Sequence, residues 1–136
     1  MKTSLIKLDW DIKKGQLKGA GKPHMKALHD YVTSYRNHDR IINVQMRSSP
    51  RKNLHVKILL ASSLSYIEEI ERRALLWDDP LRIKLDLVRL LNGEKDISLL
   101  WDYKIGNKKL RAGEWVTVYS NVYSNNRWHI DALNKL

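Results

Sequence analysis

Alternation of apolar and polar residues is the feature that most constrains the fold of this 136-residue chain. In residues 6–13 every even position is apolar and every odd position is charged. Because successive side chains of a strand point to opposite faces, this pattern predicts a strand with one buried face and one wet face. Alternation in 40–47 and in 54–60 predicts two more strands, which the proline-containing turn at 48–53 joins as a hairpin.

Two segments have helical periodicity instead. Apolar residues at helical spacing predict an amphipathic helix over 23–36, with Pro23 in its first turn, where a missing N–H costs nothing. Ser65 and Glu68 have the spacing of a capping box and predict a second helix over 65–77. The charged residues of this second helix are expected on a solvated face. Their i, i+4 pairs are Glu68–Arg72 and Glu69–Arg73.

The rest of the chain is predicted to form strands. Residues 81–91 and 97–105 both alternate and flank an Asn-Gly turn, so we expect an antiparallel hairpin. A strand over 114–123 places valines on one face and aromatic residues such as Tyr119 on the other, and 127–130 is a short last strand. With short connections, this order predicts a single α+β domain over residues 1–136, a mostly antiparallel sheet with two packed helices.

Composition excludes several classes of protein. Cysteine is absent, so disulfides, thiolate metal ligands and a cysteine nucleophile are excluded. No apolar run approaches the roughly 18 residues of a membrane span, and the N-terminus lacks the apolar stretch of a signal peptide. We therefore expect an intracellular protein whose contact with any membrane is peripheral. The five tryptophans are expected mostly in the core.

The positive charge is segregated along the chain. Residues 1–57 carry thirteen Lys or Arg and four Asp or Glu, a net charge of +9. Residues 58–103 have a net charge of −3 and residues 104–136 a net charge of +4, which together account for the net charge of +10. Such asymmetry predicts a partner with a dense negative surface, either nucleic acid, a nucleoprotein or an anionic membrane.

Most of the bases gather in three segments that connect predicted elements. Because the charge lies in loops rather than along one helix, we expect contacts to a phosphate backbone or to lipid headgroups, not the reading of base edges. The predicted binding residues are Lys13, Lys14, Lys18, Lys22 and Lys26 in the first segment, Arg47, Arg51, Lys52 and Lys57 in the second, and Lys104, Lys108, Lys109 and Arg111 in the third.

Candidate chemical motifs are weaker. His24 and His29 are five residues apart, which is not the i, i+4 spacing of a metal pair on a helix, so both are expected in solvent. His55 is expected on the wet face of its strand. The glycine-rich segment GQLKGAGK at 15–22 lacks the spacing of a nucleotide-binding loop. We expect no metal, no cofactor and no enzymatic activity.

The order of these elements resembles the matrix proteins of negative-strand RNA viruses, in particular the rhabdovirus type. The resemblance implies a structural protein that self-associates, binds ribonucleoprotein and binds the inner membrane leaflet, in the host cytoplasm or in the virion. No budding motif of the PPxY or P[ST]AP type is present, so recruitment of host budding machinery is not expected. The segments that carry the resemblance are LIKLDWDIK, PHMKALHDYV, HVKILLASS, RIKLDLVRLL, ISLLWDYKI and NKKLRAGEWVTV.

Three functional hypotheses follow. The first is a viral matrix-like protein that binds ribonucleoprotein and anionic membrane through the basic segments and forms homo-oligomers. The second is a phage- or plasmid-encoded protein that binds DNA or RNA alone. The third is a small basic nuclease or toxin that uses His38 and His129 with Asp39 or Asp131.

Overall fold

The computed structural model describes residues 2–17, 22–51, 53–94, 113–122 and 125–136. Helices and strands combine in a mainly antiparallel arrangement, which confirms the α+β class. The elements in chain order are β1 (Lys2–Trp10), η1 (Lys14–Gln16), α1 (His24–Tyr35), η2 (Arg36–Arg40), β2 (Ile41–Ser48), β3 (Leu54–Ser65), α2 (Tyr66–Leu75), α3 (Pro80–Leu91), β4 (Val116–Val122), β5 (Asn125–Trp128) and η3 (Ile130–Lys135). The turns η1 and η3 are 3-10 helical, and η2 is a π-helical turn.

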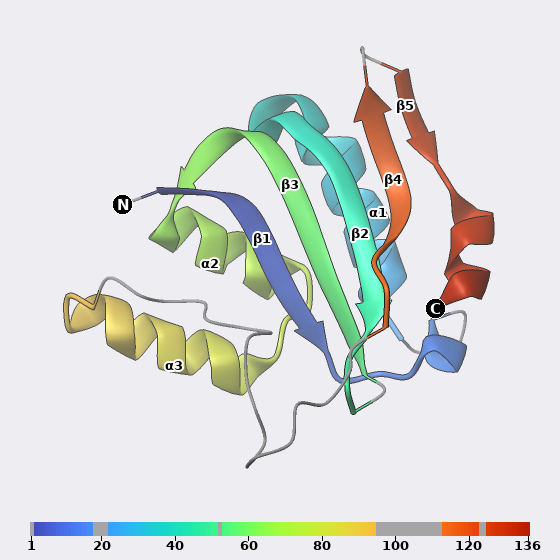
Figure 1. The fold of residues 1–136 in the computed structure, drawn as a ribbon. Helices are drawn as coiled ribbons and strands as arrows, with labels where there is room; N and C mark the ends of the chain where they lie inside the picture. Colours follow the sequence, from blue (N-terminus) through green and yellow to red (C-terminus); the bar gives the residue numbers. More distant parts are fainter. Residues whose placement is uncertain (1, 18–21, 52, 95–112, 123–124) are drawn as a thin grey trace.

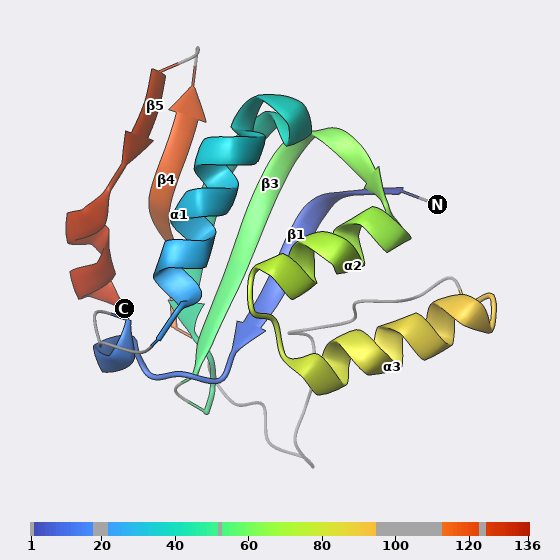
Figure 2. The ribbon, with the colours of Figure 1, turned by 180° about the vertical axis from the view of Figure 1, so that it is seen from behind.

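The sheet has five strands in the order β1-β3-β2-β4-β5, and each neighbouring pair is antiparallel (Figure 1). Since β3 lies between β1 and β2, those two strands run parallel and α1 connects them, which is a split β-α-β arrangement. The predicted hairpin is confirmed as β2 and β3, with Ser48 opposite Leu54. Helices α1 and α2 cover one face of the sheet, and α3 lies beside α2 (Figure 2).

The core lies between the sheet and these two helices. Ile6, Leu8 and Trp10 of β1 are fully buried, as the alternation predicts. The indole N–H of Trp10 donates to the carbonyl of Leu76 at 2.8 Å, so its polar atom is satisfied in the core. The prediction that most tryptophans are core residues is wrong for the described ones, since Trp77 is 55% exposed and the side chains of two others are only half-buried.

The start of α2 confirms the predicted capping box. The hydroxyl of Ser65 accepts from the backbone N–H of Glu68, and the Glu68 carboxylate accepts from that of Ser65. The predicted solvated face is wrong, because Glu69, Arg72 and Arg73 are buried. The surrounding elements supply acidic partners that sequence spacing on one helix does not reveal.

Helix α3 replaces the predicted strand over 81–91, so that prediction is wrong. Its first residue is Pro80, and the carboxylate of Asp79 caps it by accepting from the N–H of Leu81. Apolar residues in this segment fit both periods, but the cap and the proline at the first helical position favour a helix. The helix also brings Arg82 and Asp86 onto the inner face, where they meet charges from α2. The predicted partner strand, 97–105, lies outside the described residues.

The last two strands, β4 and β5, differ from the predicted strands over 114–123 and 127–130 in their bounds and in the regularity of β4. The pairing of β2 with β4 shifts between Val44 and Gln45, so Val118 and Tyr119 are both buried although they are adjacent. The predicted regular alternation of faces over 114–123 is therefore wrong at this shift. His55, predicted in solvent, lies on the sheet face away from α1 but is 1% exposed.

Candidate polyanion-binding surface

Two of the predicted basic segments meet at one end of the sheet. The ammonium group of Lys13 donates to the carbonyl of Arg51 at 3.0 Å and to the side-chain oxygen of Asn53 at 2.8 Å. These contacts join the end of β1 to the β2–β3 turn. Lys14 follows in η1, and its ammonium group donates to the carbonyl of Leu136 at 2.6 Å.

The first turn of α1 lies at the same end (Figures 1 and 2). Its His24 ring lies edge-on to the ring of Trp10, the last residue of β1, with 5.2 Å between centroids. Lys22 is exposed and lies two residues before this helix, whose first turn contains no acidic residue. We call the exposed bases at this end the basic rim. Its described members are Lys13, Lys14, Lys22 and Arg51.

A second group of cations lies on the sheet face opposite the helices. Lys7 of β1 is directly opposite Lys57 of β3. The Lys57 ammonium lies 4.1 Å from the centroid of the Trp115 ring, and the Arg47 guanidinium carbon lies 4.5 Å from it. Burial and the charges of Arg47 and Lys7 lower the pKa of Lys57. We call Lys7, Arg47, Lys57 and Trp115 the cationic sheet cluster.

His55 adjoins this cluster. The Arg47 Nε–H donates to His55 Nδ1 at 3.2 Å, so the Nδ1 atom is the acceptor and the neutral ring carries its proton on Nε2. Burial, with the charges of Arg47 and Arg82, lowers the pKa of His55 to about 4. A neutral imidazole at this position limits the repulsion inside the cluster.

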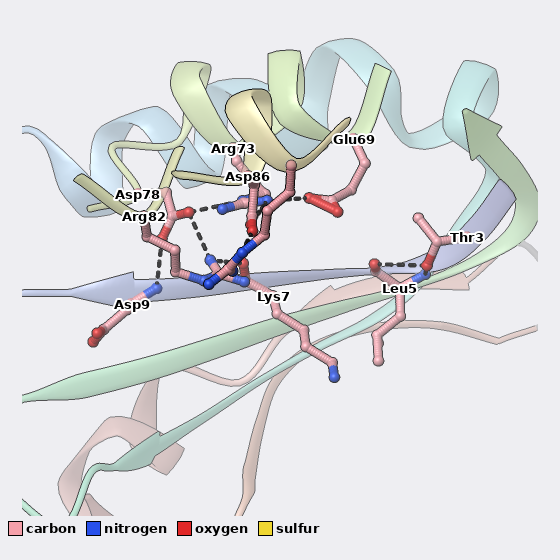
Figure 3. A network of polar contacts seen from close by, with 10 residues as sticks. Thr3, Leu5, Lys7, Asp9, Glu69, Arg73, Asp78, Arg82 and Asp86 are labelled. Carbon is pink, nitrogen blue, oxygen red and sulfur yellow. Dashed lines mark hydrogen bonds and ion pairs between the residues drawn. The ribbon is translucent and has the colours of Figure 1, made fainter. Parts of the chain in front are cut away.

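Three acids of the middle segment, Glu69, Asp78 and Asp86, are directed inward (Figure 3). The Arg73 guanidinium is 0% exposed and forms ion pairs at 2.8 to 2.9 Å with Glu69, Asp78 and Asp86. Arg82 of α3 contacts Asp78 at 2.6 Å and the carbonyl of Lys7 at 2.8 Å. We call Glu69, Arg73, Asp78, Arg82 and Asp86 the α2–α3 network. It neutralises acids inside the fold, so the excess positive charge stays at the surface.

The predicted binding residues therefore fall into four groups. Lys13, Lys14, Lys22 and Arg51 are in the basic rim, and Arg47 and Lys57 are in the cationic sheet cluster. Lys26 is exposed on α1 and pairs with Asp30 at 2.8 Å. Lys18, Lys52, Lys104, Lys108, Lys109 and Arg111 lie outside the described residues. Gly113, which follows the third segment, donates to the carbonyl of Ser48 at 2.8 Å, close to the second.

Sequence reasoning missed two members of the cationic sheet cluster. Lys7 alternates with buried Ile6 and Leu8, so its position on the polar face was open to prediction. Its proximity to Lys57 depends on the pairing of β1 with β3, which skips β2. Trp115 immediately precedes β4, and its contact with Arg47 depends on the pairing of β2 with β4, whose residues are far apart in sequence.

The residues of the nuclease hypothesis have separate partners. His38 Nδ1 lies 2.9 Å from the buried carboxylate of Asp39, whereas His129 Nε2 lies 2.9 Å from the hydroxyl of Ser120. Within the described ranges, no three His, Cys, Asp or Glu side chains form a metal-binding group. His24, predicted in solvent, is half-buried, and burial followed by the charge of Lys22 lowers its pKa. His29 is exposed, as predicted.

No helix in the part of the chain that the structure describes is long and apolar enough to cross a bilayer. Comparison of the chain with protein-family models, with curated proteins and with solved structures finds no match.

Proposed function

We propose that this protein binds nucleic acid through its phosphate backbone and that the basic rim is the contact surface. The observation that carries the proposal is the pair of hydrogen bonds from Lys13 to Arg51 and Asn53. They hold two basic segments, 38 residues apart in sequence, at one end of the sheet. A phosphate backbone is a line of negative charges, so adjacent cations from separate loops suit it.

The cationic sheet cluster supports a single-stranded ligand. Arg47 and Lys57 lie on the two strands that flank the β2–β3 turn of the rim. The cationic group of each lies over the Trp115 ring. Proteins that bind single strands combine a basic track with aromatic platforms on a sheet. The same surface thus has both components, although its charges lie in loops and strands rather than on a recognition helix.

The test is the salt dependence of binding to a single-stranded RNA or DNA oligonucleotide. The double variant Lys13→Gln/Arg51→Gln is compared with Lys2→Gln/Lys84→Gln, which removes the same charge at exposed positions away from the rim. We expect the rim variant to bind the oligonucleotide roughly tenfold more weakly than the wild type. The slope of the logarithm of its binding constant against the logarithm of salt concentration should fall in magnitude by roughly 1.4, while the control keeps the wild-type slope. Equal slopes for the two variants would contradict the proposal.

A second candidate function is favoured by one observation on the other side of the molecule. Several large apolar side chains of α2, α3 and their connection are exposed, which marks an interaction surface. They are Ile67, Leu75, Trp77, Leu81, Leu85, Leu87, Val88 and Leu91. A matrix-like protein, as the sequence resemblance implies, needs such a surface for self-association or for contact with lipid, in addition to a basic one.

Co-sedimentation separates the two candidates. A matrix-like protein should pellet with anionic liposomes more than with neutral ones at low salt, and should oligomerise in analytical ultracentrifugation. Leu85→Glu/Val88→Glu should abolish both properties and leave oligonucleotide binding intact. A monomer that binds oligonucleotides and does not pellet with liposomes supports nucleic-acid binding alone.

A further inference from the structure

A hollow of about 300 Å³ lies at the start of β2. This is the opposite end of that strand from the β2–β3 turn of the basic rim, as the course of the ribbon shows (Figure 1). Its polar lining consists of Arg36, Asn37 and Arg40 from η2 and Asn121 from β4, over an apolar wall from β2 and β3. None of the described residues that line it carries a carboxylate. The hollow is therefore a basic site, and its residues are separate from those of the basic rim and the cationic sheet cluster.

The π-helical turn explains why two arginines reach the same hollow. The backbone N–H of Ile41 donates to the carbonyl of Arg36, which closes a turn wider than that of an α-helix. This turn places Arg36 at its start and Arg40 at its end, and both side chains line the hollow. Neither has an ion-pair partner among the described residues.

The backbone at this turn is strained. Arg40 has φ of 54°, in the left-handed region that residues with a Cβ rarely adopt. The conformation is held by neighbours, since the hydroxyl of Ser62 donates to the carbonyl of Asp39 at 2.6 Å. Strain of this kind persists where the surrounding structure holds it, and it is common at binding sites.

The one acid of the turn is turned away from the hollow and into the fold. The Asp39 carboxylate accepts from the Tyr31 hydroxyl at 2.6 Å and from Arg72 at 2.8 and 3.2 Å, and His38 Nδ1 lies at 2.9 Å. Burial opposes ionisation of Asp39, but these hydrogen bonds outweigh it and lower its pKa. Its charge is thus used internally and does not neutralise Arg36 or Arg40. Arg36 also interacts with the Tyr119 hydroxyl: burial raises the pKa of Tyr119, and Arg36 opposes this with a smaller effect.

We propose that this hollow binds a phosphate group through the guanidinium groups of Arg36 and Arg40, with amide donors from Asn37 and Asn121. Planar guanidinium groups donate in pairs to phosphate oxygens, and two of them can hold a tetrahedral anion from two sides. The Asn121 amide already donates to the carbonyl of Ile41 at 3.4 Å, which holds it at the edge of the hollow. The phosphate belongs either to a free ion or nucleotide or to the 5′ end of a nucleic acid strand.

The test is titration of inorganic phosphate into the full chain, followed by NMR and calorimetry. Arg40→Gly is the key variant, because glycine accepts the positive φ, so the guanidinium is lost with the rest of the side chain without added backbone strain. We expect Arg40→Gly and Arg36→Gln each to weaken phosphate binding roughly tenfold or more, with the melting temperature of Arg40→Gly unchanged or raised. Lys84→Gln, an exposed change on α3, should bind phosphate like the wild type.

Oligonucleotides with a 5′-phosphate or a 5′-hydroxyl identify the source of the group. A preference of the wild type for the 5′-phosphate that Arg40→Gly loses assigns the hollow to strand ends, and equal binding with retained phosphate affinity assigns it to a free phosphate or nucleotide. Unchanged affinity for inorganic phosphate in both arginine variants would overturn the inference. Because this readout does not involve the basic rim, it is independent of the variant Lys13→Gln/Arg51→Gln.

Discussion

The α2–α3 network and the basic rim are two groups of charges with opposite physical roles. In the network, arginines and carboxylates are buried and paired at 2.6 to 2.9 Å, so removal of one partner leaves a charge in a low-dielectric site. In the rim, the bases are exposed and hydrogen-bond mainly to neutral oxygens. The comparison indicates that the network maintains the fold, whereas the rim is available for a partner at little cost to stability.

The strongest test of this comparison is Arg73→Met. Its loss leaves Glu69, Asp78 and Asp86 without their shared buried cation, and we expect the free energy of unfolding to fall by about 3–5 kcal/mol. Urea denaturation measures the change. The matched control is Lys84→Met on the exposed side of α3, which should change stability by about 0.5 kcal/mol or less. A loss below about 1 kcal/mol for Arg73→Met would show that the network is not essential to the fold.

His55 is intermediate between the α2–α3 network and the basic rim, because it is buried like the network but lies beside the cationic sheet cluster. Its pKa is about 4 in the folded protein, below the ordinary histidine value of 6.5. The unfolded chain therefore takes up a proton first on acidification, and stability that is fully present above pH 6.5 is lost as the pH falls toward 4. The two pKa values correspond to about 3 kcal/mol. His55→Gln should remove this pH dependence of the free energy of unfolding, which urea denaturation at a series of pH values measures. If the variant loses as much stability on acidification as the wild type, the assignment to His55 is refuted.

Asp9 should show the opposite slope. Burial, and then the charge of Asp78, raise the pKa of Asp9 to about 6. The folded state keeps its proton longer, so this contribution to stability is present below pH 3.8 and is lost as the pH rises through 6. Because the side chain is only half-buried, solvent reduces the effect to about 1 kcal/mol. Asp9→Asn should flatten this part of the profile in the same denaturation series.

The smallest expected effect on stability is that of the rim variant Lys13→Gln/Arg51→Gln. Exposed bases contribute little to folding, so its free energy of unfolding should stay within about 0.5 kcal/mol of the wild type. Thermal and urea unfolding measure this. A loss of unfolding free energy as large as that of Arg73→Met would mean that the rim also maintains the fold. The weaker oligonucleotide binding of the rim variant would then have to be corrected for the fraction of unfolded protein.

Local patterns predicted much of the fold. Alternation identified β1, β2 and β3, and the Ser65–Glu68 capping box located the start of α2, because each depends on residues close in sequence. The pattern of 81–91 fitted a strand as well as a helix. What distinguishes them is the cap from Asp79 and the ion pair of Asp86 with Arg73, and this ion pair involves a residue on another element, α2.

The candidate sites divide in the same way. Sequence alone determined that the chain carries excess positive charge, that this charge lies in segments between elements, and that one face of β1 is polar. Only the tertiary structure decided that Lys13 contacts Arg51, that Lys57 and Arg47 stack on Trp115, and that Arg73 is buried among carboxylates. The physical reason is that composition and spacing count charges, whereas strand pairing and helix packing decide which charges water reaches and which meet each other.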